Sequence, residues 1–581
     1  MKTSKPSKLW EPTRLPTPSL GAIRTQLPGL LLVLILGLAV SLRLVGLNWD
    51  DSSHIHPDER FLTMVETSLR IPSSLGEYFD TSLSPLNPHN VGHGFFVYGT
   101  LPIFLVRIVA EWAGKTGYDE VNLVGRMIST FFDLISIYLV FLIGKRLYRR
   151  RVAFLAALFT ALSVLLIQHA HFFVVDPAAN TFILAGLYFA IKILDEGSWF
   201  DYLLFGLMLG MSVASKINAA PLAGLAALAG LVRIYRAEPP EMSRVLIRTT
   251  GYLVLAAVVS LLVFRVFQPY AFQGPSFFDV KLNPRWQANM AEIQSMNRGD
   301  TDAPYALQWA DRPPIWFSFK NLVLWGLGLP LGLVAWASWA WAVWESLRGK
   351  WQRHVLLVVW TGAYFIWQSI GFTPAMRYQI PVYPTLTLLA AWGLWEAWDR
   401  ADSVRQAWRK VAKITVGVVA TVTILWTFIW ALAFASIYTR PVTRVAGTRW
   451  IYTHIPAALN VVVGAEDERL LEPIALTLEA TLASNRPYET SFKSDSEGFL
   501  AGVVLPNVRD LDPEVGTKTF TVEVMKAEAG GPTLGIQESQ ATLSTIEETT
   551  IEIRFDEPVE ISTGEAYKLR LGMTSTGGIR F

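Results

Sequence analysis

Long apolar runs alternate with short polar loops over the first three quarters of the chain. A helix needs about 20 apolar residues to cross the roughly 30 Å hydrocarbon layer of a bilayer. Runs of this kind predict about eleven membrane-spanning helices, of which the two between 200 and 235 are short. The predicted spans are 28–48, 122–143, 152–168, 177–194, 200–214, 217–235, 248–267, 321–345, 354–371, 379–395 and 414–438.

A further apolar stretch, 94–112, does not fit this alternation. It contains two glycines, a proline and an arginine, which weaken a free-standing span. We interpret it as a re-entrant or interfacial segment inside one large outer loop, 49–121. The alternative is a true span whose partner lies elsewhere.

Basic residues predict the orientation of these spans. The short loop 145–151 is the most basic, and the loops 233–248, 348–353 and 400–413 and the tail 1–27 are basic as well. All of them fall on one side if the helices alternate. Because Lys and Arg concentrate in cytoplasmic loops, we expect a multi-pass protein of the plasma (inner) membrane. Its N-terminus would be cytoplasmic and its C-terminus extracytoplasmic, with large outer loops at 49–121 and 268–320.

The pattern changes after residue 438. Apolar and polar residues alternate in 519–524 and 549–555, and Gly, Pro and Asp residues interrupt these runs. Such alternation is typical of half-buried strands. We therefore predict a tail (1–27), a transmembrane module (28–438) and an extracytoplasmic β-rich, sandwich-like domain (439–581). The chain ends in another strand-like run, so we expect this last domain to be cut short.

Composition agrees with a membrane protein. Only 17% of the 581 residues are charged, whereas soluble domains carry about 25%, and the mean hydropathy is +0.34. The formal net charge of +2 provides no broad positive field for nucleic acid. The chain has no cysteine, which excludes disulfides and thiolate catalysis. No Gly-rich phosphate loop follows a predicted strand, so a nucleotide site is not indicated.

The densest polar cluster, 50–60, directly follows the first predicted span. It holds four carboxylates and two histidines, and a second acid, Asp176, opens a later span on the same side. The cluster is either a solvated helix end or a site at the membrane surface. The amphipathic residues that follow Asp58 favour the site, because they would lay the cluster on the bilayer.

Five short motifs in a fixed order resemble a known family. They are His56-Pro57-Asp58-Glu59, the basic loop 145–151, Val175-Asp176-Pro177, Ala214-Ser215-Lys216, and Arg377-Tyr378-Gln379-Ile380-Pro381-Val382-Tyr383-Pro384. This set, over roughly 28–440, resembles the lipid carrier-dependent glycosyltransferases of the GT-C fold, which include the protein O-mannosyltransferases and the aminoarabinose transferases.

The resemblance implies an enzyme that moves a sugar, with inversion, from a polyprenyl-phosphate donor to a hydroxyl of an exported protein or a glycolipid. Asp58 would be the general base, Glu59 would support it, and Asp176 would orient a substrate. The implied substrate-binding residues are Lys216, Arg377, Tyr378, His56 and His93. The family usually has a Lys-Pro-Pro element where this chain has His89 to Gly94, and His93 is the candidate to replace the lysine.

Other interpretations remain open. Lys216 and Arg377 are equally typical of anchors at the membrane interface. Six of the eight histidines lie in the two outer loops near Asp58 and Asp176. We predict no metal site there and favour structural histidines, with a divalent cation as the alternative. A transporter or flippase would need polar sites near the bilayer midplane, where Asp133 is the clear acid. A receptor or scaffold built on the β-rich domain would leave the ordered motifs unexplained.

Overall fold

The computed structural model describes residues 20–300, 307–454, 459–464, 470–474, 480–484, 486–494, 497–512, 516–528 and 530–581. The chain divides into two compact units, Met1–Arg440 and Pro441–Phe581. Each unit has its own apolar core.

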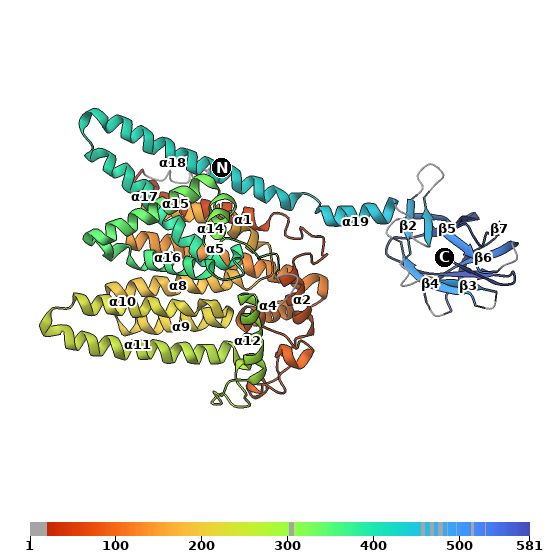
Figure 1. Ribbon diagram of the computed structural model, residues 1–581, viewed down its shortest axis with the longest axis horizontal. Coiled ribbons are helices and arrows are strands. Elements are labelled where there is room, and N and C mark those ends of the chain that lie inside the picture. Colours follow the sequence, from red (N-terminus) through yellow and green to blue (C-terminus); the bar gives the residue numbers. More distant parts are fainter. Residues whose placement is uncertain are drawn as a thin grey trace, which may run out of the picture. The chain divides into compact units, whose positions relative to one another are not determined.

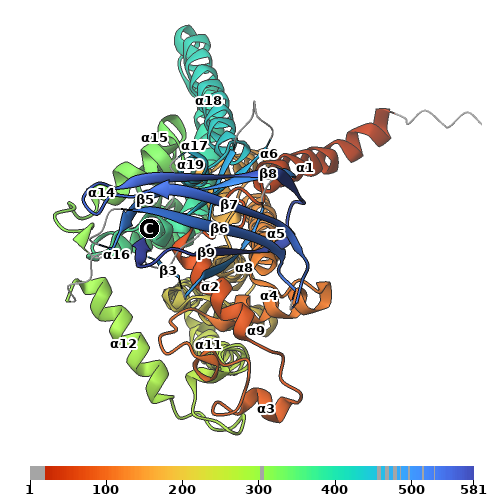
Figure 2. The ribbon, with the colours of Figure 1, turned by 90° about the vertical axis from the view of Figure 1, so that its right-hand side faces the viewer.

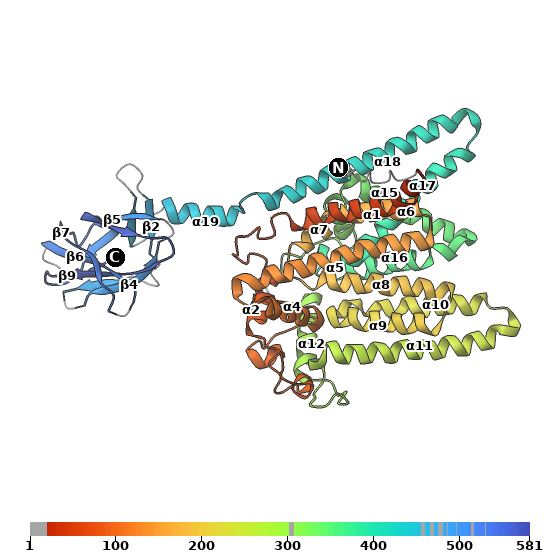
Figure 3. The same cartoon turned by 180° about the vertical axis from the view of Figure 1, so that it is seen from behind.

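The first unit is a bundle of apolar helices that run alongside one another (Figures 1 and 3). Helix α8 lies in its middle and packs against α5, α9 and α10. Leu187 on α8, Leu222 and Leu389 are fully buried in the shared core. The helices of the bundle are α1 (Leu20–Leu44), α5 (Tyr118–Leu147), α6 (Arg150–Ala161), α7 (Val164–Ala170), α8 (Asp176–Asp195), α9 (Trp199–Ser215), α10 (Ala223–Arg236), α11 (Pro239–Phe267), α14 (Trp316–Asn321), α15 (Leu329–Glu345), α16 (Val355–Ser369), α17 (Tyr383–Arg400) and α18 (Gln406–Ala435).

Short helical turns join several of these helices. They are η2 (Ile217–Leu222), η4 (Leu322–Gly326), η5 (Ser346–Lys350), η6 (Trp351–Arg353), η7 (Met376–Val382), η8 (Ala401–Ser403) and η9 (Ser436–Thr439). Two of these turns matter for the site described below: η7 contains Arg377 and Tyr378, and η2 directly follows Lys216.

The helices confirm a polytopic membrane protein. Among the described residues, five helices are long and apolar enough to cross a bilayer: Tyr118–Leu147, Asp176–Asp195, Ile217–Arg236, Pro239–Phe267 and Gln406–Ile451. A sixth span results if α6 and α7, which meet at 58°, are counted together, and Pro28–Leu44, α9 and α16 are shorter apolar helices. The expected eleven spans and the orientation remain predictions.

One end of the bundle is covered by the two large loops. The first holds α2 (Pro57–Ser68), α3 (Leu75–Phe79), η1 (Pro88–Val91) and α4 (Thr100–Ala113), and the second holds η3 (Pro269–Ala271) and α12 (Pro284–Arg298). Helix α4 occupies the apolar stretch that we interpreted as interfacial. Its 14 residues span about 21 Å at 1.5 Å per residue, which is less than the hydrocarbon thickness.

The second unit confirms the β-rich C-terminal domain. It begins with α19 (Thr443–His454) and continues with two antiparallel sheets (Figure 2). Buried side chains of both sheets, such as Val503, Phe520 and Leu569, share one core, as in a sandwich. The strands are β1 (Asn460–Val463), β2 (Leu470–Pro473), β3 (Thr481–Ala483), β4 (Tyr488–Lys493), β5 (Gly498–Asp510), β6 (Thr517–Lys526), β7 (Thr533–Thr542), β8 (Thr549–Ile561), β9 (Ala566–Met573) and β10 (Gly578–Arg580).

The order of the strands follows no simple meander. One sheet has the order β2-β1-β5-β10-β3, with β8 also paired to β5, and the other has the order β4-β9-β6-β7. In β6 the residues alternate between buried and half-exposed, as the sequence pattern predicted.

Candidate functional site

The start of helix α2 is set by His56 and Pro57. The Nδ1 atom of His56 accepts a hydrogen bond from the Glu59 backbone N–H at 3.3 Å, and Pro57 fills the first helical position. The His56 ring stacks on Phe172, with 4.2 Å between ring centroids. Burial lowers the pKa of His56 to about 3. The imidazole is therefore neutral, and it fixes the helix turn that presents Asp58.

Glu59 and Asp50 are joined through a buried arginine of α5. The Nη2 atom of Arg126 lies 2.9 Å from Asp50 Oδ1, and its Nε donates to Glu59 Oε2 at 3.1 Å. The Phe173 backbone N–H donates to the same Glu59 oxygen at 2.7 Å. Asp50, Glu59 and Arg126 are all fully buried. Burial raises the pKa of Glu59, and the guanidinium opposes that rise.

This cluster ties α2 to α5 and to the turn before α8. Consecutive residues of a helix point about 100° apart, so Asp58 faces away from the buried cluster that holds Glu59. Sequence reasoning missed Arg126. The sequence feature that could have identified it is a single arginine inside the predicted apolar span 122–143, close to the polar end of that span.

Asp58 forms an ion pair with Arg377 of η7. Both side chains are accessible, with 19% of Asp58 and 32% of Arg377 exposed. The Arg377 guanidinium carbon lies 5.5 Å from the centre of the Tyr378 ring. The late motif therefore reaches the first acidic motif across more than 300 residues of chain.

Asp176 and Lys216 form a second ion pair, with 2.5 Å between Oδ1 and Nζ. Asp176 opens α8, and Lys216 lies in the turn between α9 and η2. The Lys216 ammonium sits 5.0 Å from the centre of the same Tyr378 ring. The structure thus brings both carboxylates and both cations named above around Tyr378.

Two cavities and one narrow gap meet at Tyr378. The first cavity, of about 490 Å³, is lined by Asp58 and Arg377 together with apolar residues such as Phe61 and Trp309. The second, of about 550 Å³, runs along α12 and is lined by Asn218 and Trp286 among others. The gap beside Asp176 and Lys216 measures only about 10 Å³, which is about the space of one water molecule.

His93 lies apart from the two ion pairs. Its Nε2 atom is 3.4 Å from the Ser68 hydroxyl at the C-terminal end of α2, and its ring meets Phe61 edge-on. Phe61 lines the first cavity, but His93 is not among the lining residues of either cavity. Its role as a replacement for the family's lysine remains a prediction.

The histidines of these loops have structural partners. His54 contacts Asp119 with 3.3 Å between Nε2 and Oδ1. The two ring nitrogens of His171 lie 2.9 Å from the carbonyl oxygens of Ile167 and Val45. Within the part of the chain that the structure describes, no group of three or more His, Asp or Glu side chains is arranged to hold a metal ion.

These features define a class of protein: a polytopic membrane protein with paired charges and open cavities at one end of its bundle. A family model for "Dolichyl-phosphate-mannose-protein mannosyltransferase" matches residues 104–269, which confirms the resemblance noted in the sequence. The matched stretch contains Asp176 and Lys216, whereas Asp58 and Arg377 lie outside it. None of the curated proteins compared with the chain matches it.

The solved structures that are similar to this chain include glycosyltransferases of the GT-C fold. The oligosaccharyltransferase AglB from Archaeoglobus fulgidus, solved with an inhibitory peptide and a dolichol-phosphate, has a TM-score of 0.48 and 15% identity over 74% of this chain and 58% of its own. ArnT from Cupriavidus metallidurans, solved with undecaprenyl phosphate, has a TM-score of 0.44 and 15% identity over 70% and 75%. The Pmt1-Pmt2 complex of S. cerevisiae has a TM-score of 0.33 and 17% identity over 45% and 36%. The chain spans less than two thirds of the length of AglB.

Proposed function

We propose that this protein is a membrane-embedded glycosyltransferase that moves a sugar, with inversion, from a polyprenyl-phosphate donor to a hydroxyl of an exported protein or a glycolipid. The reaction would take place at the outer face of the plasma membrane, with the N-terminus of the chain in the cytoplasm. The observation that carries the proposal is the pair of ion pairs, Asp58–Arg377 and Asp176–Lys216, around one tyrosine ring.

The proposed step needs a base on one side of the sugar and a cation on the other. Asp58 takes the proton of the acceptor hydroxyl as its oxygen bonds to the anomeric carbon. The bond from that carbon to the phosphate oxygen breaks, and the electron pair leaves with the phosphate. Arg377 neutralises the charge that develops there, because its planar fork matches two phosphate oxygens.

In the structure, Arg377 is paired with the proposed base itself. A donor phosphate that draws the guanidinium away leaves the Asp58 carboxylate free to accept a proton. When Arg377 exchanges Asp58 for the donor phosphate, the donor is bound and the base is activated in the same step. Lys216 can exchange Asp176 for phosphate in the same manner, since Tyr378 lies beside both cations.

The two cavities support separate approaches for the two substrates. Asp58 lines the first cavity and not the second, so we assign the first cavity to the acceptor. The second cavity opens beside Ile217 and Asn218, next to Lys216, and we assign it to the donor sugar. Arg377, which we assign to the donor phosphate, lines the first cavity and the narrow gap but not the second cavity. The phosphate would therefore lie where the cavities meet, at Tyr378.

The test is the Asp58→Asn variant in membranes supplied with a labelled polyprenyl-phosphate sugar. We expect transfer to fall by about 100-fold or more, as for the loss of a general base, while the protein still accumulates. Glu292→Gln is the matched control, because Glu292 is an exposed acid on α12 that lines neither cavity. Unchanged transfer by Asp58→Asn would remove the proposed base.

The transporter alternative has less support. A transported substrate needs polar groups near the midplane that line a path. Asp133 instead bonds to Arg43, with 2.5 Å between Oδ2 and Nε, and the two side chains are 3% and 0% exposed. Arg43 also donates to the Ala161 carbonyl at 2.9 Å. This pair holds α1, α5 and α6 together.

A further inference from the structure

A second polar site lies at the other end of the helices that build the first. Helix α8 begins with Asp176 beside Lys216 and ends with Asp195. The 19 steps between these residues cover about 28 Å at 1.5 Å per residue, which is close to the roughly 30 Å hydrocarbon thickness. Helix α17 likewise starts just after Tyr378 and reaches Asp399 before it ends. The second site is thus at the opposite border of the bilayer.

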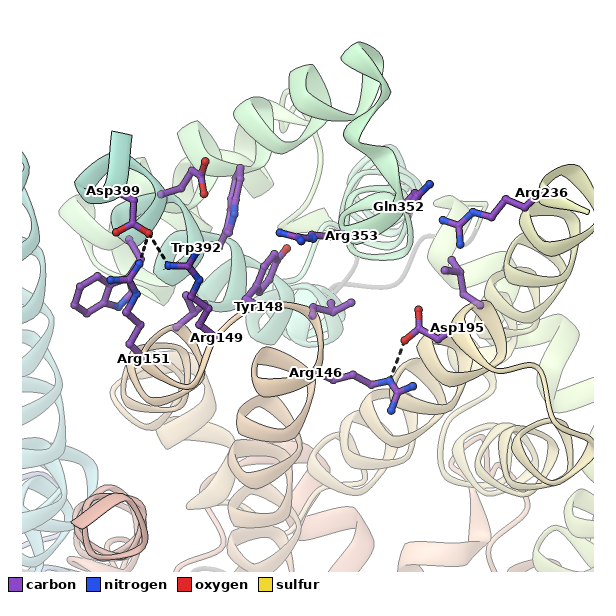
Figure 4. Close-up of a pocket in the computed structure, with 15 residues that line it drawn as sticks. Arg146, Tyr148, Arg149, Arg151, Asp195, Arg236, Gln352, Arg353, Trp392 and Asp399 are labelled. Carbon is purple, nitrogen blue, oxygen red and sulfur yellow. Dashed lines mark hydrogen bonds and ion pairs between the residues drawn. The ribbon is translucent and has the colours of Figure 1, made fainter. Parts of the chain in front are cut away.

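This site is a pocket of about 420 Å³ lined by residues of α5, α6, α8, α10, η6 and α17 (Figure 4). Aromatic side chains, Tyr148, Trp392 and Trp395, form part of its wall. Tyr148 contacts His354, with 2.9 Å between its hydroxyl and Nδ1. Five arginines also line the pocket: Arg146, Arg149, Arg151, Arg236 and Arg353.

The carboxylates of the pocket are already paired. Asp195 binds Arg146 at 3.1 Å, and Asp399 binds Arg149 at 3.2 Å and also Arg151. Figure 4 shows these pairs on separate walls. Glu396 binds Arg400, with 2.9 Å between Oε1 and Nε. The three acids are thus paired with arginines other than Arg236 and Arg353.

Arg236 and Arg353 have no carboxylate partner among the described residues. The Arg236 guanidinium lies over the Trp351 ring, at 4.9 Å from its centre. Arg353 lines this pocket and also a neighbouring cavity of about 440 Å³. Both arginines are exposed, and two cations that line one pocket without a carboxylate partner favour an anion in that pocket. Guanidinium groups suit phosphate best, because each fork donates two parallel hydrogen bonds to its oxygens.

We propose that this pocket binds a phosphate group through Arg236 and Arg353. The group is carried by an anionic membrane lipid or is free in solution, and the chemistry of recognition is the same for both sources. Tryptophans at the bilayer border and basic pockets between transmembrane helices are features of lipid headgroup sites. The proposal is independent of the sugar transfer proposed at the other end of the bundle.

The experiment uses the full-length protein in nanodiscs of phosphatidylcholine with or without phosphatidylglycerol. Bound lipid is counted by native mass spectrometry, and the unfolding midpoint is measured in parallel. We expect the wild type to retain phosphatidylglycerol and to gain thermal stability. The double variant Arg236→Gln/Arg353→Gln should retain it about tenfold more weakly or worse, given the contribution of each basic residue near a lipid surface.

Arg405→Gln/Arg409→Gln is the matched control. Both arginines are exposed, lie at the same end of the bundle and do not line the pocket, so this variant loses the same charge elsewhere. It should bind phosphatidylglycerol like the wild type. Equal losses in the control and the pocket variant would overturn the proposal, because general surface charge would then explain the binding.

A second arm identifies the source of the phosphate. Inorganic phosphate is compared with chloride at equal ionic strength, in phosphatidylcholine nanodiscs alone. Stabilisation of the wild type by phosphate but not of the pocket variant indicates a soluble ligand, whereas a response to phosphatidylglycerol alone indicates a lipid. No response of the wild type to either probe overturns the proposal. If the double variant does not fold, Arg353→Lys is used in its place. We expect it to bind the phosphate group more weakly than the wild type but still measurably, because lysine keeps the charge and loses the planar fork.

Discussion

Arg126 holds Asp50 and Glu59 in a buried cluster, whereas Asp58, one residue before Glu59, faces the open cavity and Arg377. Neighbouring acids of one short motif thus have different environments. The buried acid fixes the position of α2, and the accessible acid is the one placed to meet a substrate. We therefore treat Glu59 as a positioning residue for Asp58.

Removal of Arg126 tests this division of roles. Arg126→Met leaves two buried carboxylates without their cationic partner, and breaking such a buried pair costs about 3–5 kcal/mol. We expect a large fall in the unfolding midpoint in detergent, followed by loss of transfer. Lys115→Met is the control, because the Lys115–Glu120 pair is half exposed and such pairs contribute about 1 kcal/mol or less. Equal midpoints for the two variants would contradict the structural role of the cluster.

His56 predicts a pH dependence of stability. Its pKa in the fold, about 3, is below its ordinary value of 6.5. Below pH 6.5 the unfolded chain binds a proton at His56 that the folded chain does not. Stability therefore falls as the pH drops from 6.5 toward 3, by at most about 1.4 kcal/mol per pH unit from this group.

The His56→Asn variant isolates that contribution. Asparagine is a good helix N-cap and does not titrate, so the variant should lose less stability than the wild type between pH 7 and pH 5. Unfolding midpoints at both pH values give the comparison. Identical losses in the two proteins would exclude a buried neutral His56.

At the scale of elements, the site depends on how closely α4 approaches the end of α9. Gly99, which precedes α4, lies against the backbone of Ala214 and Ser215, and a Cβ atom at this position would overlap their carbonyl groups. The turn that carries Lys216 follows directly. The contact therefore sets the position of Lys216 relative to Tyr378.

Gly99→Ala should displace this turn. We expect a lower unfolding midpoint and weaker donor binding, which would appear as a raised KM for the donor. Gly224→Ala is the control, because nothing lies within 4 Å of its added Cβ and alanine is favoured in a helix by about 1 kcal/mol. A KM in Gly99→Ala equal to that of the control would show that the close approach does not position Lys216.

At the scale of the whole molecule, the two units have separate cores. We propose that the β-rich unit helps to recruit the acceptor. Deletion of residues 441–581 should then reduce transfer to the acceptor more than hydrolysis of the donor, when both are measured in the same membranes. Equal loss of both activities would instead point to a role in folding of the bundle.

The sequence by itself determined the class of elements. Apolar runs of membrane length predicted a helical bundle, and the alternation in 519–524 predicted a strand that the structure confirms as part of β6. These patterns are local: they depend on the period of a helix or a strand and on nothing distant. The same is true of the ordered motifs, because each is a short local pattern and their order along the chain is enough to carry the resemblance to a family.

Only the tertiary structure decided which charges meet. The sequence suggested Asp58, Asp176, Lys216 and Arg377, but it could not pair them. The position of Arg126 near the end of an apolar span was a signal, but it did not identify Glu59 and Asp50 as the partners. It likewise could not show that Arg236 and Arg353 share a pocket. A salt bridge requires a separation of a few ångströms between side chains that are far apart in the chain. The packing of the helices sets that separation, and local patterns of hydrophobicity do not determine how the helices pack.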